Sequence, residues 1–376
     1  MNSFLNPESS INKIKDNNLR FAFADGLRGL SALWVVFFHL SEGHHIDKLK
    51  AYFPPTLSAV LFDSGHLGVA TFFVLSGYVM AYTVHQYDVD LRFSAKFILR
   101  RLIRLSPPYY FAILVSIAFL WLKSKVTGGV ASFPNEIGLA SHLLYFQGFL
   151  KIPLLNTVFW TLCIEVQFYH AFVVMVFFSD WLTKRFKFAN ARLYTICIFA
   201  LLGPPWAFGF ILTPIWQGGF ITFWYSFMVG VSVSWAVSSR DKSFIIFSVI
   251  MVFLVLIAGF TTLQGFPLMV TFSAAIILYA GLYGKMSTWL NWQWLQGLGL
   301  ISYSLYLLHN PITGAVANLI RRFYAEGIVT DLIISATTLI ACVLSAWMAF
   351  KFIERPSIRW SHTVSPTKTG RKSDKI

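Results

Sequence analysis

SFIIFSVIMVFLVLIAGF, residues 243–260, is a continuous apolar stretch that contains no charged residue. Its length is close to the roughly 20 residues that a helix needs to cross a hydrocarbon core of about 30 Å. The whole chain of 376 residues has the same character, because 56% of its residues are hydrophobic and only 12% are charged. A soluble globular protein carries about 25% charged residues. The stretch and the composition together predict an integral membrane protein.

Similar apolar stretches recur along the whole chain. They cover residues 27–46, 59–83, 105–122, 157–178, 192–212, 219–238, 243–260, 266–283, 298–320 and 330–352. Segments of about ten residues with alternating hydrophobicity, which are typical of membrane β-barrels, are absent. We therefore predict an all-α fold, a polytopic bundle of about ten transmembrane helices.

The charged residues predict how this bundle is oriented. We expect one membrane domain over residues 22–360, between polar tails at 1–21 and 361–376. If the N-terminus is cytoplasmic, most of the 30 Lys and Arg residues fall on the cytoplasmic side, as the positive-inside rule requires. This asymmetry predicts that both ends are cytoplasmic. It also explains the net charge of +14 without a nucleic-acid partner.

The first span carries two ionisable side chains on one face. Such groups cost roughly 2.5–3.5 kcal/mol each inside a bilayer, so they usually mark function. Arg28 and His39 are 11 residues apart, a separation that returns to within about 20° of one direction and rises about 16 Å. We expect Arg28 at the cytoplasmic mouth and His39 in the middle of the bundle. The alternatives are a charged anchor and a packing histidine, and the shared face favours function.

Two other spans carry ionisable groups at a similar estimated depth. Glu165 lies about 14 Å below the outer edge and must be neutralised, paired or catalytic, with Tyr169 one turn away. His309 also lies near mid-depth, and Pro311 after it removes a backbone hydrogen bond and leaves a carbonyl available. His39, Glu165 and His309 therefore form our candidate catalytic group.

Several further residues are candidates for binding. Arg101 and Arg104 are spaced to face one direction on a helix, and arginine forks suit phosphate groups, although lipid headgroups are an alternative partner. His66 lies near the outer end of the second span, where it can meet a polar acceptor. Ser76 and Tyr78 follow in a segment whose small residues also suit tight helix packing. The cysteines form no CxxC pattern, and we predict no metal.

Six segments carry a resemblance to a known family. They are Asp25–Leu30 with its Arg-x10-His, Gly65–Tyr78, Arg100–Tyr109 with its Arg-x2-Arg, Trp160–Tyr169, Ser302–His309 and Phe352–Pro356. In this order they resemble acyltransferase family 3, membrane acyltransferases that modify surface polysaccharides. The resemblance implies a ten-helix domain that takes an acyl group, usually from cytoplasmic acetyl-coenzyme A, and delivers it to a sugar hydroxyl across the membrane. The chain resembles the stand-alone form, which has no C-terminal esterase-like domain.

The resemblance and the geometry give the candidate residues their expected roles. Arg28, Arg101 and Arg104 are expected to bind the phosphates of the acyl-coenzyme A donor. His39 is expected to act as general base toward the acceptor hydroxyl or to carry the acyl group itself, because a pKa of about 6.5 leaves neutral imidazole available at pH 7. Glu165 or His309 is expected to orient it.

The acceptor side completes the predicted set of residues. Substrate contacts are expected from His66, Ser76, Tyr78, Tyr169 and Asn310, with Ser76 and Tyr78 lining the acyl path. The expected partners are acyl-coenzyme A, membrane lipids and a glycan acceptor such as lipopolysaccharide or exopolysaccharide, at the bacterial inner membrane. A proton-coupled transporter or flippase is the alternative, and we find none of the inverted repeats and paired broken helices that would favour it.

Overall fold

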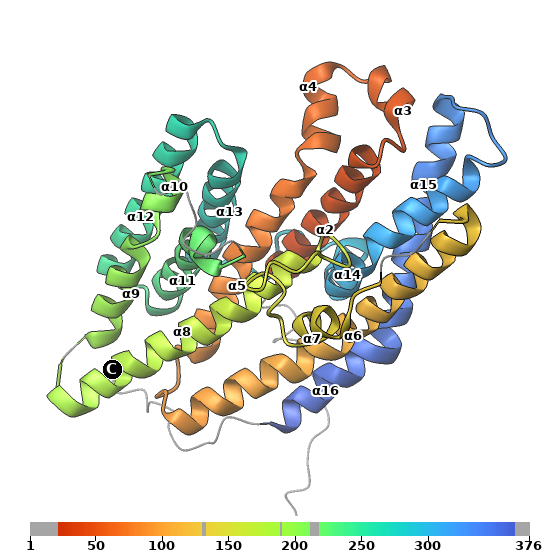
Figure 1. Ribbon diagram of the computed structural model, residues 1–376. Helices are drawn as coiled ribbons and strands as arrows, with labels where there is room; N and C mark the ends of the chain where they lie inside the picture. The colour runs from red at the N-terminus through yellow and green to blue at the C-terminus, as the bar shows by residue number, and fades with distance from the viewer. Residues whose placement is uncertain (1–21, 130–132, 189, 211–217, 365–376) are drawn as a thin grey trace, which may run out of the picture.

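The computed structural model describes residues 22–129, 133–188, 190–210 and 218–364 (Figure 1). Helices make up the regular structure throughout these ranges, and no β-strand forms within them. The all-α prediction is therefore confirmed. The predicted tail at 1–21 and the residues after 364 lie outside the described residues, and the last helix continues to Thr363, slightly beyond the predicted end of the membrane domain.

The long helices follow one another along the chain. They are α2 (Ala22–Glu42), α5 (Gly68–Val84), α6 (Leu91–Thr127), α8 (Phe159–Phe186), α9 (Ala191–Leu201), α11 (Trp224–Ser239), α12 (Lys242–Thr262), α13 (Gly265–Leu282), α14 (Gln293–Ile320) and α15 (Ile328–Ala349). Shorter turns of helix connect or cap them. These are α3 (Asp47–Tyr52), α4 (Pro55–Ser58), η1 (Ala59–Asp63), η2 (Gly65–Leu67), α7 (Glu136–Leu143), α10 (Pro204–Ala207), η3 (Phe220–Phe223), η4 (Phe350–Glu354) and α16 (Arg355–Thr363).

Eight helical segments in the described residues are long and apolar enough to cross a membrane, which confirms a multi-pass membrane protein. The sequence predicted ten spans, and two of them are not among these eight segments. The predicted span 192–212 begins as α9, which ends at Leu201 and gives way to a turn and to α10. The predicted span 298–320 lies within α14, which has the length but carries polar side chains through its middle. The side of the membrane on which each end lies stays a prediction.

The centre of the molecule is the crossing of α2 with α14 (Figure 1). The two backbones touch because glycine stands on both sides of the contact. A Cβ at Gly29 would lie 2.8 Å from the Gly299 backbone nitrogen, and a Cβ at Gly299 would overlap the Asp25 carbonyl oxygen. This close approach places Arg28, one residue before Gly29, directly beside α14.

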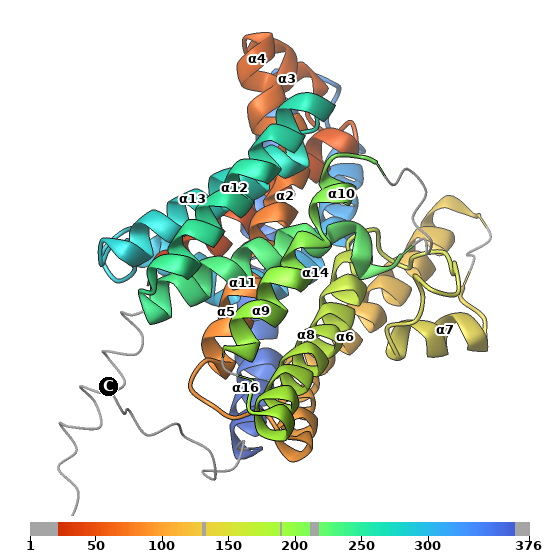
Figure 2. The same cartoon turned by 90° about the vertical axis from the view of Figure 1, so that its left-hand side faces the viewer.

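A second glycine contact joins α5 to α11. A Cβ at Gly77 would overlap the Phe227 carbonyl oxygen, and a Cβ at Gly230 would overlap the Val74 carbonyl oxygen. The predicted tight helix packing of this segment is thereby confirmed. Figure 1 shows α9, α11, α12 and α13 on one side of α5, and in Figure 2, which views the molecule from that side, they lie in front of it. The glycine contact therefore attaches this group of helices to the centre.

Alanine at Gly230 is expected to lower the free energy of unfolding by about 1–3 kcal/mol, because the added methyl group meets backbone that cannot rotate away. The matched control is Gly314→Ala in α14, where a Cβ meets nothing within 4 Å and alanine is the better helix former. Thermal unfolding in detergent should show a lower midpoint for Gly230→Ala and an equal or higher midpoint for Gly314→Ala. Equal midpoints for both variants would contradict the close contact.

The segment with Arg101 and Arg104 and the predicted span 105–122 form one continuous helix, α6, with two prolines in its interior. A proline removes the backbone hydrogen bond to the residue four positions earlier, so Pro108 leaves the Arg104 carbonyl without its helical partner. The Ser357 hydroxyl of α16 donates to this carbonyl at 3.2 Å. The interruption in α6 therefore docks α16 against the segment that carries Arg101 and Arg104.

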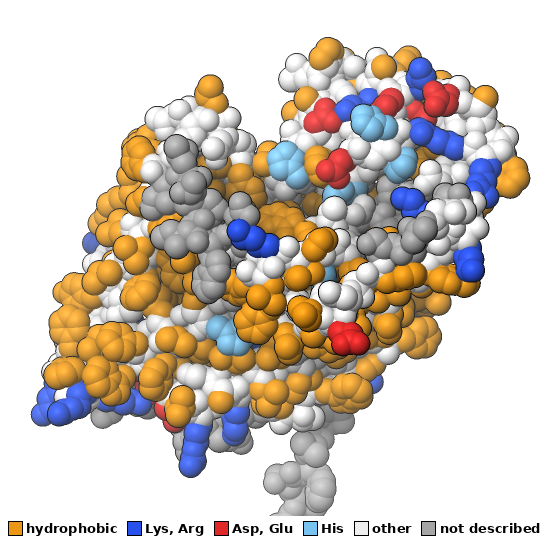
Figure 3. All heavy atoms as spheres, viewed as in Figure 1, with side chains coloured by type: hydrophobic (Ala, Val, Ile, Leu, Met, Phe, Trp, Pro, Cys, Tyr) orange, Lys and Arg blue, Asp and Glu red, His pale blue; other side chains and the backbone are white. Residues whose placement is uncertain are grey.

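The two ends of the molecule differ in their polar side chains. Figure 3 shows Lys and Arg side chains along the edge where α6 begins and α8 ends, and a mixed cluster of acidic, basic and histidine side chains at the opposite end. At that opposite end, Lys50 of α3 donates to the Asp63 carboxylate at 2.5 Å, and Ser41 donates to the same oxygen at 3.0 Å. The Lys50 hydrogen bond lowers the pKa of Asp63. These contacts fasten η1 over the end of α2.

Candidate active site

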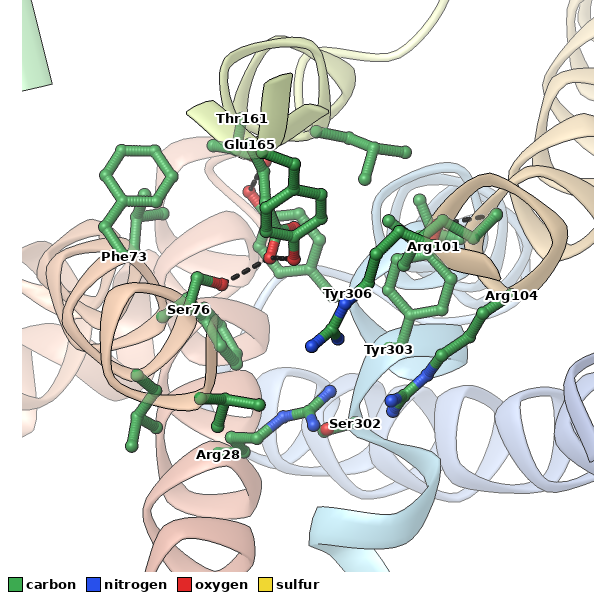
Figure 4. A pocket seen from close by; sticks show the side chains of 18 residues that line it. Arg28, Phe73, Ser76, Arg101, Arg104, Thr161, Glu165, Ser302, Tyr303 and Tyr306 are labelled. Atoms are coloured by element: carbon green, nitrogen blue, oxygen red, sulfur yellow. Dashed lines mark hydrogen bonds between the residues drawn. The ribbon is translucent and has the colours of Figure 1, made fainter. Parts of the chain in front are cut away.

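A pocket lies between α2, α5, α6, α8 and α14 (Figure 4). Arg28 of α2 and Arg101 and Arg104 of α6 point into it from one side, and their guanidinium groups converge. Phe73 of α5 and Thr161 of α8 lie on the other side of the pocket. The three arginines that the sequence singles out are therefore brought together in one place.

These arginines have no carboxylate partner within 4.0 Å among the described residues. Arg101 instead lies over the rings of Phe97 and Tyr169, with its guanidinium carbon 5.4 and 5.6 Å from the two centroids. Guanidinium groups removed from water need a compensating anion, and converging arginine forks match phosphate oxygens in geometry and charge. The pocket fits a ligand with several negative charges.

Two carboxylates outside the pocket lining, the buried Glu354 and the half-buried Asp25, interact with these arginines. Glu354 is 3% exposed and accepts a hydrogen bond from Ser304 at 2.6 Å. Glu354 and Asp25 both interact electrostatically with Arg28 and Arg104. Glu354 ends the π-helical turn η4, a kind of helix irregularity frequent at functional sites. It belongs to the segment Phe352–Pro356, but the sequence analysis did not assign it a role in the site.

Glu165 lies in the arginine pocket and makes no hydrogen bond with His39 or His309 in the described part of the chain. Its carboxylate accepts hydrogen bonds from Ser76 of α5 and Tyr169 of α8. The expectation that Glu165 orients His39 is therefore not supported by any contact of its carboxylate. Counting residues along a helix gives the depth of a side chain, but not which neighbouring helix it faces.

The two predicted histidines do meet. The imidazole rings of His39 and His309 have centroids 5.0 Å apart, and His309 is completely buried. Nδ1 of His309 lies 2.8 Å from the Tyr306 carbonyl oxygen and 3.1 Å from that of Leu305. Because a carbonyl oxygen only accepts, Nδ1 carries the hydrogen, and Nε2 of the neutral ring keeps its lone pair. That Nε2 has no hydrogen-bond partner among the described residues.

His39 has a carboxylate partner that the sequence analysis missed. Nδ1 of His39 lies 2.7 Å from Oε2 of Glu42, so it donates to that carboxylate and leaves a lone pair on Nε2. The signal was present, because residues three apart face one another on a helix. Helix α2 begins and ends several residues earlier than the predicted span, and His39 therefore lies in its last turn rather than at its middle.

Tyr306 stands between the pocket and the histidine pair. It lines the pocket, and the centroid of its ring is 5.8 Å from that of His309. Its hydroxyl accepts a hydrogen bond from Thr161 at 2.9 Å, and its ring makes an edge contact with Phe72 at 5.5 Å. Tyr306 thus forms part of the wall of the arginine pocket and contacts His309 outside that pocket.

Three of the predicted substrate residues lie elsewhere. His66 of η2 lies beside the end of α2, where its ring centroid is 5.1 Å from that of Phe38, the neighbour of His39. Tyr78 is 2% exposed and lies in the hydrophobic core, outside the lining of the pocket. Asn310 donates to Asn156 at 3.1 Å and to Thr157 at 2.8 Å, which are contacts within the fold.

The carbonyl that Pro311 leaves without a helical donor is that of Leu307, and another part of the chain bonds to it. Pro311 cannot donate to the carbonyl of Leu307, four residues earlier. The side-chain amide of Asn156 donates to that oxygen at 3.3 Å. The same Asn156 accepts from Asn310, so the segment just before α8 holds α14 on both sides of His309.

Comparisons with known proteins bear on this arrangement. The family model of acyltransferase family 3, described as an acyltransferase domain, matches residues 21–347. O-acetyltransferase OatA of Staphylococcus aureus (strain NCTC 8325 / PS 47) is 25% identical in an alignment 392 residues long. The alignment covers 88% of this chain and 56% of OatA. BcsY of Komagataeibacter xylinus, a proposed membrane-bound transacylase, is 30% identical over 211 residues, 51% of this chain and 48% of BcsY.

The chain spans about half the length of these curated relatives. No solved structure matches it. The matched region contains every residue that lines the arginine pocket, together with both histidines and Glu42. The chain belongs to acyltransferase family 3.

Proposed function

We propose that the protein is an integral membrane O-acyltransferase, in the simplest case an O-acetyltransferase. It moves an acyl group from cytoplasmic acyl-coenzyme A to a hydroxyl of a surface or lipid-linked glycan. The observation that carries this proposal is the position of Tyr306, which lines the arginine pocket and contacts His309, the partner of His39. The name of the relative OatA, an O-acetyltransferase, supports the same reaction.

The arginine pocket suits the donor. Coenzyme A carries several phosphate charges, and the guanidinium groups of Arg28, Arg101 and Arg104 converge without a carboxylate within 4.0 Å in the described residues. Arg101 and Arg104 lie in the first half of α6, and the positive-inside rule assigns the basic end where α6 begins to the cytoplasm. This assignment brings the pocket to the side on which acyl-coenzyme A is made, and it favours the inner membrane of a bacterium as the location.

The histidine pair suits the acceptor. Glu42 holds the hydrogen on Nδ1 of His39, so Nε2 can accept the proton of a sugar hydroxyl. The sugar oxygen attacks the carbonyl carbon of the thioester, the carbon–sulfur bond breaks, and the coenzyme A sulfur leaves with the proton that His39 held. His309 presents a second lone pair, which can accept a hydrogen bond from a neighbouring hydroxyl of the sugar. If His39 instead carries the acyl group, the same Nε2 attacks the thioester carbonyl, the carbon–sulfur bond breaks and coenzyme A leaves as the thiolate. The sugar oxygen then takes the acyl group from Nε2, and the hydroxyl proton goes to the thiolate.

The test is mass spectrometry of surface glycans from a host that lacks this activity, grown with and without the gene. A mass increase of one acyl group per modified sugar is expected, and it identifies the acyl group and the acceptor together. Purified protein in detergent should consume acetyl-coenzyme A when that glycan is added. Unchanged glycan masses with an altered amount of glycan at the cell surface would instead favour a transporter or flippase.

A further inference from the structure

We propose that Tyr306 and Phe72 form the end wall of the donor pocket and restrict the enzyme to short acyl groups. This inference rests on the proposed function. The pocket has a cationic side, made by the three arginines, and Figure 4 shows Phe73 of α5 away from them. Val69, Phe72 and Leu307 are further apolar residues of the lining. A donor whose phosphates contact the arginines therefore extends its thioester and acyl group toward Tyr306, beyond which lies His309.

The wall is held firmly in place. Tyr306 is only 9% exposed, and its hydroxyl is fixed by the hydrogen bond from Thr161 at 2.9 Å. The edge of the Phe72 ring packs against it at 5.5 Å from the opposite helix, α5. Because the Tyr306 carbonyl also accepts from His309, the backbone at this position is tied to the histidine as well. Neither ring can move without breaking one of these contacts.

A fixed wall limits the length of the group that ends against it. An added methylene in a closed apolar pocket changes selectivity by about 10–200-fold, because the longer chain must displace packed side chains. With the thioester on the pocket side of Tyr306, an acetyl methyl group fits against the wall and a butyryl chain meets the rings. We therefore expect a strong preference for the acetyl donor over the butyryl donor.

The experiment compares kcat/KM for acetyl-coenzyme A and butyryl-coenzyme A with purified protein and the glycan acceptor. Tyr306→Ala and Phe72→Ala should each raise the butyryl-to-acetyl ratio by about tenfold or more. Tyr306→Phe keeps the ring and loses only the hydrogen bond from Thr161, so its ratio should change less. Tyr225→Ala removes a buried tyrosine of α11 outside the lining and should leave the ratio unchanged.

The ratio is insensitive to the fraction of folded enzyme, since both donors are measured on one preparation. If the wild type uses both donors equally, or if Tyr306→Ala and Phe72→Ala lose both activities in proportion, the wall does not set acyl length and the proposed function stands. Should Tyr306→Ala fail to fold, Phe72→Ala decides the question alone. A wild type that consumes neither donor would overturn the proposed function and this inference together.

Discussion

His39→Ala is expected to lower kcat for acyl transfer by about 10²–10⁴-fold and to leave KM for the acyl-coenzyme A donor nearly unchanged. The His39 ring contacts that of His309, and His309 contacts Tyr306 in the pocket lining. The loss of the imidazole therefore removes the proton acceptor without touching the arginines. Steady-state kinetics of purified enzyme, at saturating acceptor, measure both constants. The effect should be the largest of any single substitution in the protein.

Two other variants separate catalysis from folding. Glu42→Gln keeps a hydrogen-bond acceptor beside Nδ1 of His39 but removes the charge, so its kcat should lie between those of the wild type and His39→Ala. His44→Ala removes an exposed histidine at the same end of the protein, one that pairs with Asp47 at 3.1 Å, and should leave both constants unchanged. Full activity in a folded His39→Ala protein would exclude the general-base role and the acyl-carrier role alike.

Arg101→Gln is expected to raise KM for acetyl-coenzyme A by about 10–100-fold with little change in kcat. A hydrogen bond to a charged group contributes about 1.5–3 kcal/mol, and the guanidinium of Arg101 is among the three that converge in the pocket. Arg101→Lys keeps the charge and loses the planar fork, so its KM should rise by less. The increase should be measured with the donor varied and the acceptor saturating.

The chain offers a close control for this substitution. Arg185 at the end of α8 also lies over an aromatic ring, with its guanidinium carbon 5.7 Å from the Phe186 centroid, but it stands outside the pocket. Arg185→Gln should therefore leave KM unchanged. If Arg101→Gln and Arg28→Gln both bind the donor as tightly as Arg185→Gln does, the pocket does not hold the coenzyme phosphates.

The helical architecture could be predicted from the sequence because the bilayer imposes it. Long apolar segments have only the helix as a way to satisfy their backbone, so composition and length decide the secondary structure. The pairing of Arg28 with His39 could also be predicted, since 11 residues is close to a whole number of turns. Both side chains do face α14, where Arg28 lines the pocket with Ser302 and His39 meets His309.

The neighbours of each polar group could not be predicted in the same way. Glu165 and the histidines have similar estimated depths, but Glu165 faces Ser76 on α5, and that direction depends on how helices pack. The close approach of α5 to α11 at Gly77 and Gly230 helps to set this direction, and the sequence does not say which helix a glycine will meet. The polar side chains in the middle of α14 likewise lower its hydropathy, so that α14 is not among the eight helices of the described residues that are apolar enough to cross a membrane.

Asn156 gives the histidine pair a dependence on a distant part of the chain. Pro311, two residues after His309, interrupts the internal bonding of α14, and the missing donor comes from the segment that precedes α8. The orientation of the His309 ring therefore depends on residues about 150 positions away in sequence. A change in that connecting segment can therefore misalign the reaction without altering any group that meets the substrate, and homologues that differ there can differ in rate while sharing every reactive side chain.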